Sequence, residues 1–480
     1  MAQADSPGPI ETRLFINNEF QPGADGKVFN LINPYTQEIV PQVHEAGEQD
    51  VNKAVAAAKA AFPTWRDLSP AERGVHLRKM AELIRESQPE LARLESISTG
   101  KPVSSYFDAK IAEGYFSYFA EAGWNVQGSS SLNTPGNLNL TVKQHYGVVA
   151  CIIPWNIPIG FFALKLAPAL AAGNTVVLKS SEKAPLTSAF AAKLAVKAGF
   201  PPGVINVISG FGSPAGSTLA SHMDVRCLSF TGSTRTGQKI QAAAAMSNMK
   251  TVHLELGGKS PAIVFEDADL ESAAQQTQFS IQLMSGQSCM ANSRIYVQES
   301  VAEKFRTLFK ENFSAAANLG NPLDPSISHG PQVDKIQYDR VKTFLAVGEK
   351  DGKLTMGGDG RDGLFIKPTV FENDSQIMKE EIFGPVVVIN TFSTEAEAIE
   401  KASNIEFGLY VSVFTRNLDR AVRFSKLLEA GTFGINCTSP SIANDMPFGG
   451  FKMSGLGREG FMHGLYSYLE TKTILIKMGA

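Results

Sequence analysis

The chain contains 480 residues, of which 43% are hydrophobic and 19% charged, and its formal net charge at neutral pH is −3. This composition is typical of a globular protein with roughly two or three domains. Because the chain has no basic excess, it does not match the pattern of proteins that bind the phosphate backbone of nucleic acids.

The four cysteines lie far apart, at positions 151, 227, 289 and 437. Their spacing predicts neither a disulfide framework nor a metal site, and free thiols are typical of a reducing compartment. Residues 1–13 show neither the apolar centre of a signal peptide nor an arginine-rich transit pattern. No uninterrupted apolar run reaches the roughly 18 residues that a membrane span needs. We therefore expect a cytoplasmic protein with no membrane partner.

Short apolar runs alternate with helical patterns in the middle third of the chain. Residues 147–154, 175–179, 203–208 and 227–232 are predicted to be strands, and residues 160–173, 185–198 and a segment from about 234 are predicted to be helices. Such alternation predicts a parallel sheet covered by helices. Ligands bind to sheets of this kind at the carboxyl ends of the strands.

A second α/β region is predicted from residue 258 to residue 452. It contains a predicted helix at 301–316 and a predicted strand at 384–392. The polar segment 128–145 is typical of an exposed hairpin, which we expect to pair with another subunit.

The pattern Gly-x-Gly-x-x-Gly occurs at 358–363 and at 455–460. A dinucleotide-binding fingerprint must follow a buried strand and open a helix. Neither segment meets this condition, so we interpret the first as a turn and assign the second to a different pattern.

The segment LSFTGSTRTGQKI (228–240) is a better cofactor candidate. An apolar strand ends at Phe230, a loop of small residues follows, and a helix is expected to begin near Ser233 or Thr234. Gly232 and Gly237 would let a backbone or a ring approach closely. The N-terminus of a helix offers free N–H groups to a pyrophosphate. A simple N-capped turn would show the same local pattern.

Lys179 and Glu182 follow a predicted strand, at the carboxyl edge of the sheet. A carboxylate at this edge accepts hydrogen bonds from ribose hydroxyls and repels a 2′-phosphate, which favours NAD over NADP. The alternative interpretation is a solvated pair in a loop.

Three further segments carry candidate catalytic groups. Glu255 lies in an apolar run before two glycines, where burial raises the pKa of a carboxyl and suits a general base. Asn156 follows Trp155 after a buried strand, where its amide could donate to a developing oxyanion. Cys289 lies among small polar residues that leave a thiol open to a ligand. The structural alternatives are a buried acid, a turn-capping asparagine and a buried free cysteine.

Seven motifs follow one another along the chain: PWN (154–156), KSSE (179–182), FTGST (230–234), LELGGK (254–259), GQSC (286–289), EEIFGP (380–385) and PFGGFKMSGLGREG (447–460). Their order resembles the aldehyde dehydrogenase superfamily over nearly the whole chain, from FINNEF (15–20) to LETKTILIK (469–477). The chance of matching all of them in this order is negligible.

The resemblance implies a catalytic nucleophile at Cys289, a general base at Glu255 and an oxyanion-hole amide at Asn156, joined by the backbone N–H of Cys289. It links Lys165 and Glu459 to a proton path toward the general base.

The resemblance also implies NAD as the cofactor. Lys179 and Glu182 match the contacts to the adenosine ribose, and Ser233 matches the contact to the pyrophosphate beside Gly232. Glu381 and Phe383 match the nicotinamide-ribose side, and Trp155 is placed with the same cofactor site.

The implied fold is α/β, with three parts. These are a Rossmann-like NAD-binding domain (1–126 and 146–257), an α/β catalytic domain (258–452) and a small β oligomerisation arm (127–145 and 465–480). The implied assembly is a homodimer or a homotetramer.

The implied reaction is the oxidation of an aldehyde to a carboxylic acid through a cysteine thiohemiacetal and a thioester, which a Glu-activated water hydrolyses. One alternative is a relative that passes the acyl group to coenzyme A, although such an enzyme would not need Glu255. Another is a catalytically idle binding or structural relative, against which the intact Cys289, Glu255 and Asn156 argue. An enzyme for a large, specialised aldehyde would share the chemistry.

Two substitutions depart from the family's usual motifs. Asn292 stands where glycine is usual, and we expect it to adopt a left-handed backbone or to add a polar group near the pocket. KSSE replaces the common KPSE, which we interpret as a minor change.

The loop 438–446 is small and polar, whereas many relatives carry an aromatic residue there. We expect Asn444 and Asp445 to form a polar rim, and Phe161 and Phe162 to form an apolar wall opposite. Such a pocket would suit a medium-sized or functionalised aldehyde.

Overall fold

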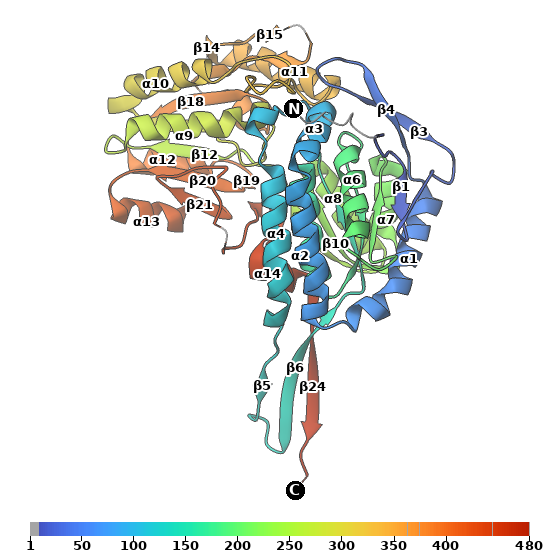
Figure 1. The fold of residues 1–480 in the computed structure, drawn as a ribbon. Helices are drawn as coiled ribbons and strands as arrows, with labels where there is room; N and C mark the ends of the chain where they lie inside the picture. The colour runs from blue at the N-terminus through green and yellow to red at the C-terminus, as the bar shows by residue number, and fades with distance from the viewer. Residues whose placement is uncertain (1–8, 362, 374, 444, 480) are drawn as a thin grey trace.

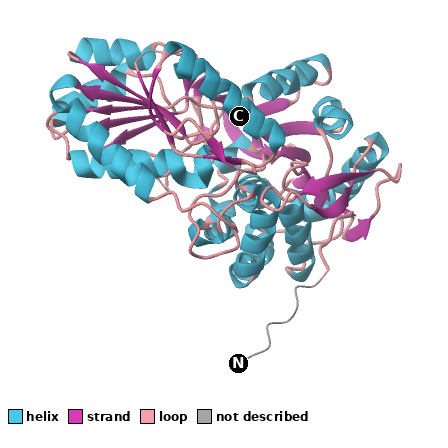
Figure 2. Cartoon of the chain, turned by 90° about the horizontal axis from the view of Figure 1, so that it is seen from above, coloured by secondary structure: helices cyan, strands magenta, loops and turns pink. Residues whose placement is uncertain are grey.

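The computed structural model describes residues 9–361, 363–373, 375–443 and 445–479. Two sheets with their helices make up the body of the molecule, and a narrow arm of strands projects from it (Figure 1). Seen from above, helices flank the strands of the sheets (Figure 2). Within the described residues, no helix is both long and apolar enough to cross a membrane.

The first sheet has eight strands in the order β2-β1-β9-β8-β7-β10-β11-β23. Its strands are β1 Leu14–Ile16, β2 Glu19–Gln21, β7 Val148–Ile152, β8 Thr175–Lys179, β9 Ile205–Ile208, β10 Val225–Thr231, β11 Thr251–Glu255 and β23 Gly455–Leu456. β7 to β11 run parallel to one another, and β1, β2 and β23 pair in the antiparallel sense.

Helices cover both faces of this sheet. They are α1 Glu48–Arg66, α2 Pro70–Glu86, α3 Gln88–Thr99, α4 Asp108–Ala122, α5 Pro158–Ala171, α6 Pro185–Lys197, α7 Ser217–Ser221, α8 Thr234–Met246 and α14 Phe461–Ser467. A separate hairpin is formed by β3 Val28–Ile32 and β4 Ile39–His44.

Side chains along each strand alternate between the two faces. In β7, Val149 and Cys151 pack into the core that contains α2, α4, α5 and α6, whereas Val148, Ala150 and Ile152 pack into the core that contains α1 and α7. All five residues are buried, so the strand is a continuous apolar run, as is typical of parallel sheets. The four strands and three helices predicted for the middle third of the chain are confirmed.

The second sheet has seven strands in the order β14-β17-β18-β13-β12-β20-β21, all parallel to their neighbours except β14. Its strands are β12 Pro261–Val264, β13 Arg294–Gln298, β14 Lys353–Met356, β17 Thr369–Glu372, β18 Val386–Phe392, β20 Tyr410–Phe414 and β21 Thr432–Ile435. Its helices are α9 Leu270–Gln282, α10 Ala302–Ala315, α11 Lys335–Asp351, α12 Glu395–Ser403 and α13 Leu418–Leu427. The predicted helix at 301–316 and strand at 384–392 are confirmed as α10 and β18.

The boundary predicted at residue 258 falls between the two sheets. β11 ends at Glu255 in the first sheet, and β12 begins at Pro261 in the second. A short pair, β19 Phe407–Gly408 with β22 Phe451–Lys452, precedes the return of the chain to the first sheet at β23. We propose this position as the boundary between a cofactor domain and a catalytic domain.

The arm consists of β5 Ser130–Ser131, β6 Asn137–His145 and β24 Leu469–Lys477, in the order β24-β6-β5. The hairpin predicted at 128–145 is confirmed. The second arm segment, predicted from residue 465, begins instead at Leu469 because residues 465–467 end helix α14, where Leu465 is buried in the core.

The two Gly-x-Gly-x-x-Gly segments have the local structures that the sequence suggested. The first contains β15 Gly360–Arg361, which pairs with β16 Phe365–Ile366 and opens no helix. The second begins with β23, which places Gly455 opposite Glu255 of β11. The second segment is therefore part of the surroundings of Glu255.

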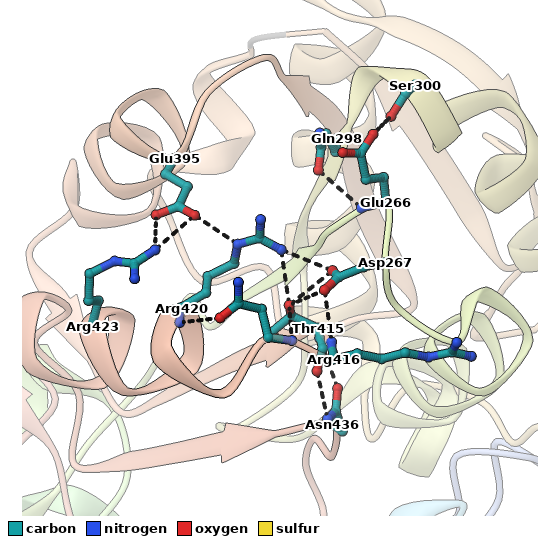
Figure 3. A network of polar contacts seen from close by, with 11 residues as sticks. Glu266, Asp267, Gln298, Ser300, Glu395, Thr415, Arg416, Arg420, Arg423 and Asn436 are labelled. Carbon is teal, nitrogen blue, oxygen red and sulfur yellow. Dashed lines mark hydrogen bonds and ion pairs between the residues drawn. The ribbon is translucent and has the colours of Figure 1, made fainter.

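A network of polar contacts covers the carboxyl ends of β12 and β20 (Figure 3). Asp267 accepts hydrogen bonds from Thr415 Oγ1 at 2.9 Å and from Arg420 at 3.0 Å. Arg420 also donates to Glu395 at 2.8 Å, and its guanidinium lies 4.1 Å from the centre of the Phe265 ring. These side chains form hydrogen bonds with one another at the carboxyl edge of the second sheet, where α/β sheets often bind ligands. Cys289, which precedes β13, lies at the opposite edge of this sheet.

Replacing Arg420 by alanine should lower the free energy of unfolding by about 2 kcal/mol, because it leaves two partly buried carboxylates without their shared partner. Arg423 binds the same Glu395 from a more exposed position. Its replacement by alanine should therefore cost less than about 1 kcal/mol. Urea unfolding followed by circular dichroism measures both values, and equal losses would contradict the role given to Arg420.

Candidate active site

The predicted site residues gather where the carboxyl ends of the first sheet meet the amino ends of the second. Glu255 is the last residue of β11, and Lys179 is the last residue of β8. Cys289 precedes β13, and Glu381 precedes β18. Because parallel strands end at the same edge, residues far apart in the sequence approach one another here.

Cys289 lies in the loop between α9 and β13, and its side chain is partly accessible. Asn156, which follows β7, is 5% exposed and donates a hydrogen bond from Nδ2 to the carbonyl of Gln287 at 3.1 Å. This bond uses one of the two amide hydrogens of Asn156. The other amide hydrogen has no acceptor among the described residues.

Glu255 is buried, and neither of its carboxylate oxygens has a hydrogen-bond partner among the described residues. Burial raises the pKa of this carboxyl to about 8, and the charge of Glu459 adds to the effect. Burial also raises the pKa of the Cys289 thiol well above its ordinary value, reinforced by the charges of Glu255 and Glu381. Each group therefore favours the neutral form of the other, so a proton must leave before either can act as nucleophile or base.

Lys165 and Glu459 form a buried ion pair near Glu255. Ser229 Oγ donates to Glu459 Oε1 at 3.1 Å, and Glu459 Oε2 has no partner among the described residues. The pairing of β23 with β11 brings Glu459 close enough to Glu255 for its charge to affect the carboxyl.

The segment that joins β10 to α8 has the strand–turn–helix form predicted for it. Ser233 is the N-cap of α8, and its Oγ accepts from the N–H of Thr236 at 3.4 Å. A Cβ at Gly232 would lie 2.5 Å from the Phe230 ring, and a Cβ at Gly237 would lie 2.6 Å from Leu256. Only glycine therefore lets the turn and the helix pack this closely against the strand.

Lys179 Nζ donates to the carbonyl of Ser180 at 2.9 Å, and burial lowers its pKa to about 8. Glu182 lies in the loop that follows and is partly exposed. The ammonium and the carboxylate thus lie at the edge of the first sheet, as the sequence predicts.

Glu381, Phe383 and Trp155 lie on the other side of the site. Glu381 Oε1 accepts from the N–H of Gly258 at 3.1 Å, and burial raises the pKa of this carboxyl to about 7. The Phe383 ring meets the Trp155 ring edge-to-face with 5.4 Å between centres. Phe383 also has a left-handed backbone, with φ +61.

The predicted walls of the substrate pocket differ in their positions. Phe161 and Phe162 both belong to the core of the first sheet. Phe161 is 8% exposed, and Phe162 is fully buried with its ring 6.5 Å from that of Phe116. Asp445 is exposed, and Asn444 lies outside the described residues.

Asn292 does not have the left-handed backbone that we expected, so that prediction is wrong. Its side chain is fully buried, and its Oδ1 accepts from Thr438 Oγ1 in the loop 438–446. Ser439 Oγ of the same loop donates to the carbonyl of Met290 at 2.8 Å. The alternative expectation, a polar group added near the substrate pocket, stays a prediction.

The sequence analysis missed three polar residues that hold the Cys289 loop. All three are buried: Ser285, Gln287 and Gln332. The side chain of Gln332 donates to the carbonyl of Ser285, and the side chain of Gln287 accepts from the N–H of Val333. Gln287 is part of the GQSC motif and Ser285 directly precedes it, but Gln332 is remote in the sequence and has no local signal that marks it.

The model of the aldehyde dehydrogenase family matches residues 20–474. An aldehyde dehydrogenase of Emericella nidulans is 46% identical over 476 residues, which cover 97% of this chain and 95% of the relative. The cytosolic aldehyde dehydrogenase 1 of Rattus norvegicus is 43% identical over 496 residues, which cover 99% and 98%.

Solved structures give the same result. The γ-glutamyl-γ-aminobutyraldehyde dehydrogenase of Burkholderia cenocepacia J2315 superposes with a TM-score of 0.96 at 42% identity, over 98% of this chain and 97% of that one. The P. syringae indole-3-acetaldehyde dehydrogenase AldA, in complex with NAD⁺, has a TM-score of 0.96 at 38% identity over the same shares. With the family model and these relatives in agreement, the chain belongs to the aldehyde dehydrogenase family.

Proposed function

We propose that the chain catalyses the NAD-dependent oxidation of an aldehyde to a carboxylic acid, with Cys289 as nucleophile and Glu255 as general base. The observation that carries the proposal is the buried, unpartnered Glu255 carboxylate beside the Cys289 thiol, whose loop is bonded to Asn156. Burying a carboxylate without a hydrogen-bond partner destabilises the fold, so such a group is typical of a functional site.

The first step is attack of the Cys289 thiolate on the aldehyde carbon. A carbon–sulfur bond forms, and the carbonyl electrons move onto oxygen. The free amide hydrogen of Asn156 and the backbone N–H of Cys289 stabilise this oxyanion, and one such donor is worth roughly 3 kcal/mol. Cysteine suits this step because it is strongly nucleophilic and forms a thioester that water can cleave.

When bound, NAD supplies the acceptor for the hydride that leaves the former aldehyde carbon, which leaves a thioester on Cys289. Glu255 then takes a proton from water, and the hydroxide attacks the thioester carbon. The carbon–sulfur bond breaks, the acid departs and the Cys289 thiolate is restored. Lys165 and Glu459 lie near Glu255, where they could pass its proton onward.

Several residues fit NAD. The N-terminus of α8 at Ser233 presents N–H groups to a pyrophosphate beside Gly232. In this proposal, Lys179 and Glu182 would bind the adenosine ribose, and Glu381, Phe383 and Trp155 would hold the nicotinamide-ribose end. These assignments are part of the proposal.

The substrate we propose is a medium-sized or functionalised aldehyde. The relatives and solved structures include enzymes named for retinal, indole-3-acetaldehyde and γ-glutamyl-γ-aminobutyraldehyde. Their substrates differ in size and charge, so a panel must sample each class. We also propose a cytoplasmic homodimer or homotetramer, because the outer edge of β24 is open to pairing and the thiols need a reducing compartment.

The test is NADH formation by the purified protein with aliphatic, aromatic and semialdehyde substrates, beside Cys289→Ala. We expect activity in the wild type and none in the variant. Activity that requires added coenzyme A would show that the acyl group is transferred to coenzyme A and not to water. Measurable NAD binding without oxidation of any aldehyde, by NAD or NADP, would overturn the proposal.

The turnover rate of the wild type should rise with pH through about 8. Glu255 has a raised pKa, so it is neutral below this pH and becomes a competent base only above it. Glu255→Gln should lose more than about 100-fold in steady-state rate, because it removes the base that activates water. Stopped-flow measurement of NADH formation by Glu255→Gln should show an initial burst, and its steady-state rate should no longer rise with pH through about 8. A variant whose rate depends on pH as the wild-type rate does would show that the base is another residue.

Glu182→Gln should reduce the preference for NAD over NADP by about tenfold, because it removes the charge that repels a 2′-phosphate. The measurement is kcat/KM for the two cofactors at a saturating aldehyde. Glu400→Gln, which changes an exposed carboxylate of α12, is the control. An unchanged ratio in Glu182→Gln would remove this residue from the cofactor site.

A further inference from the structure

Three consecutive residues just before the nucleophile have left-handed backbones. The φ angles of Met284, Ser285 and Gly286 are +53, +54 and +77. Glycine adopts this region freely, but methionine and serine do so rarely because their Cβ atoms crowd the backbone. Such residues persist only where the surroundings hold them.

The turn is held first through Ser285. Its Oγ donates to the carbonyl of Gly330 at 2.7 Å, and its own carbonyl accepts from Gln332 Nε2 at 3.1 Å. Ser285 and Gln332 are both buried, so water does not compete for these bonds.

Gln287 makes the second set of contacts. Its Oε1 accepts from the N–H of Val333 at 2.9 Å, and its Nε2 donates to the carbonyl of Met284 at 2.9 Å. The segment 330–333 therefore holds the turn at both ends. Gln287 also accepts the hydrogen bond from Asn156, so the oxyanion-hole amide is aligned with the same turn.

The opposite side of the turn is blocked by backbone. A Cβ added at Gly286 would lie 2.0 Å from the carbonyl carbon of Gly384, next to Phe383. The turn therefore cannot relax toward the cofactor side without moving the segment that carries Phe383 and Glu381.

We propose that Ser285 and Gln332 are positioning residues that hold this strained turn and thereby place the Cys289 thiol and the Asn156 amide together. The inference rests on the proposed function, in which Cys289 is the nucleophile. Neither residue touches the reacting atoms. Their effect passes through the backbone of residues 284–289.

Ser285 allows a sharp test because two small substitutions separate the tether from the strain. Ser285→Ala removes the bond to Gly330 and keeps the Cβ that disfavours the left-handed region. Ser285→Gly removes the same bond together with the Cβ, so the turn keeps its conformation without a tether. Under a purely structural role, glycine would be the worse substitution because it removes more buried volume.

The first readout is the rate of Cys289 alkylation by iodoacetamide in the cofactor-free protein across pH, with the modified peptide identified by mass spectrometry. The second is the separation of kcat from KM in NADH formation. We expect Ser285→Ala to slow both alkylation and kcat by about tenfold with little change in KM, and Ser285→Gly to stay within about threefold of wild type. Gln332→Met should behave like Ser285→Ala.

Ser98→Ala is the matched control, since Ser98 is also buried and its Oγ donates to the carbonyl of Leu94 at 2.7 Å. It should change thermal stability without changing alkylation. Equal rates for the alanine and glycine variants of Ser285, or a slower glycine variant, would overturn the inference. If the wild type oxidised no aldehyde, the proposed function would fail instead, and the alkylation rates would still report on the turn.

Discussion

A carboxylate held out of water without a partner is the constraint on which the site depends. Glu255 ends β11, and its backbone carbonyl accepts from the N–H of Gly232 in the cofactor-side turn. The strand behind it pairs with β23, which brings Glu459 and its ion pair with Lys165 into place. The backbone of β11 thus fixes the position of Glu255, the turn at Gly232 and the neighbouring charges of Glu459 and Lys165.

The elements of the first sheet could be predicted because their signals are local. β7 and β8 are buried along their whole length, β10 is buried at every residue except Arg226, and each ends in a polar turn. α5 and α8 begin directly after the turns that follow β7 and β10. The resemblance to a family with a known order of motifs then indicated which turn residues share a site. The structure brings Cys289, Glu255, Asn156 and Lys165 with Glu459 to one edge, although their roles are still proposals.

The remaining features depend on contacts between distant segments. Gln332 lies 45 residues beyond Gln287 along the chain. No local pattern indicates that its amide donates to the carbonyl of Ser285, in the turn before Cys289. Asn292 was expected to adopt a special backbone conformation, but a hydroxyl from residue 438 binds its side chain instead. Phe161 and Phe162 lie next to each other on α5, and only the packing of the helices around α5 shows that both belong to the core.

The pairing of β24 with β6 also has a consequence for how the chain is made. β6 ends at His145, and its partner β24 begins at Leu469, so the two strands leave the ribosome at widely separated times. Strand β11 likewise gains its partner β23 late, and Lys165 gains its partner Glu459 late. Contacts between such distant segments form late because a long loop must close first. Synthesis is therefore nearly complete before Glu255 acquires its neighbour Glu459, and a chain truncated before β23 would lack this part of its surroundings.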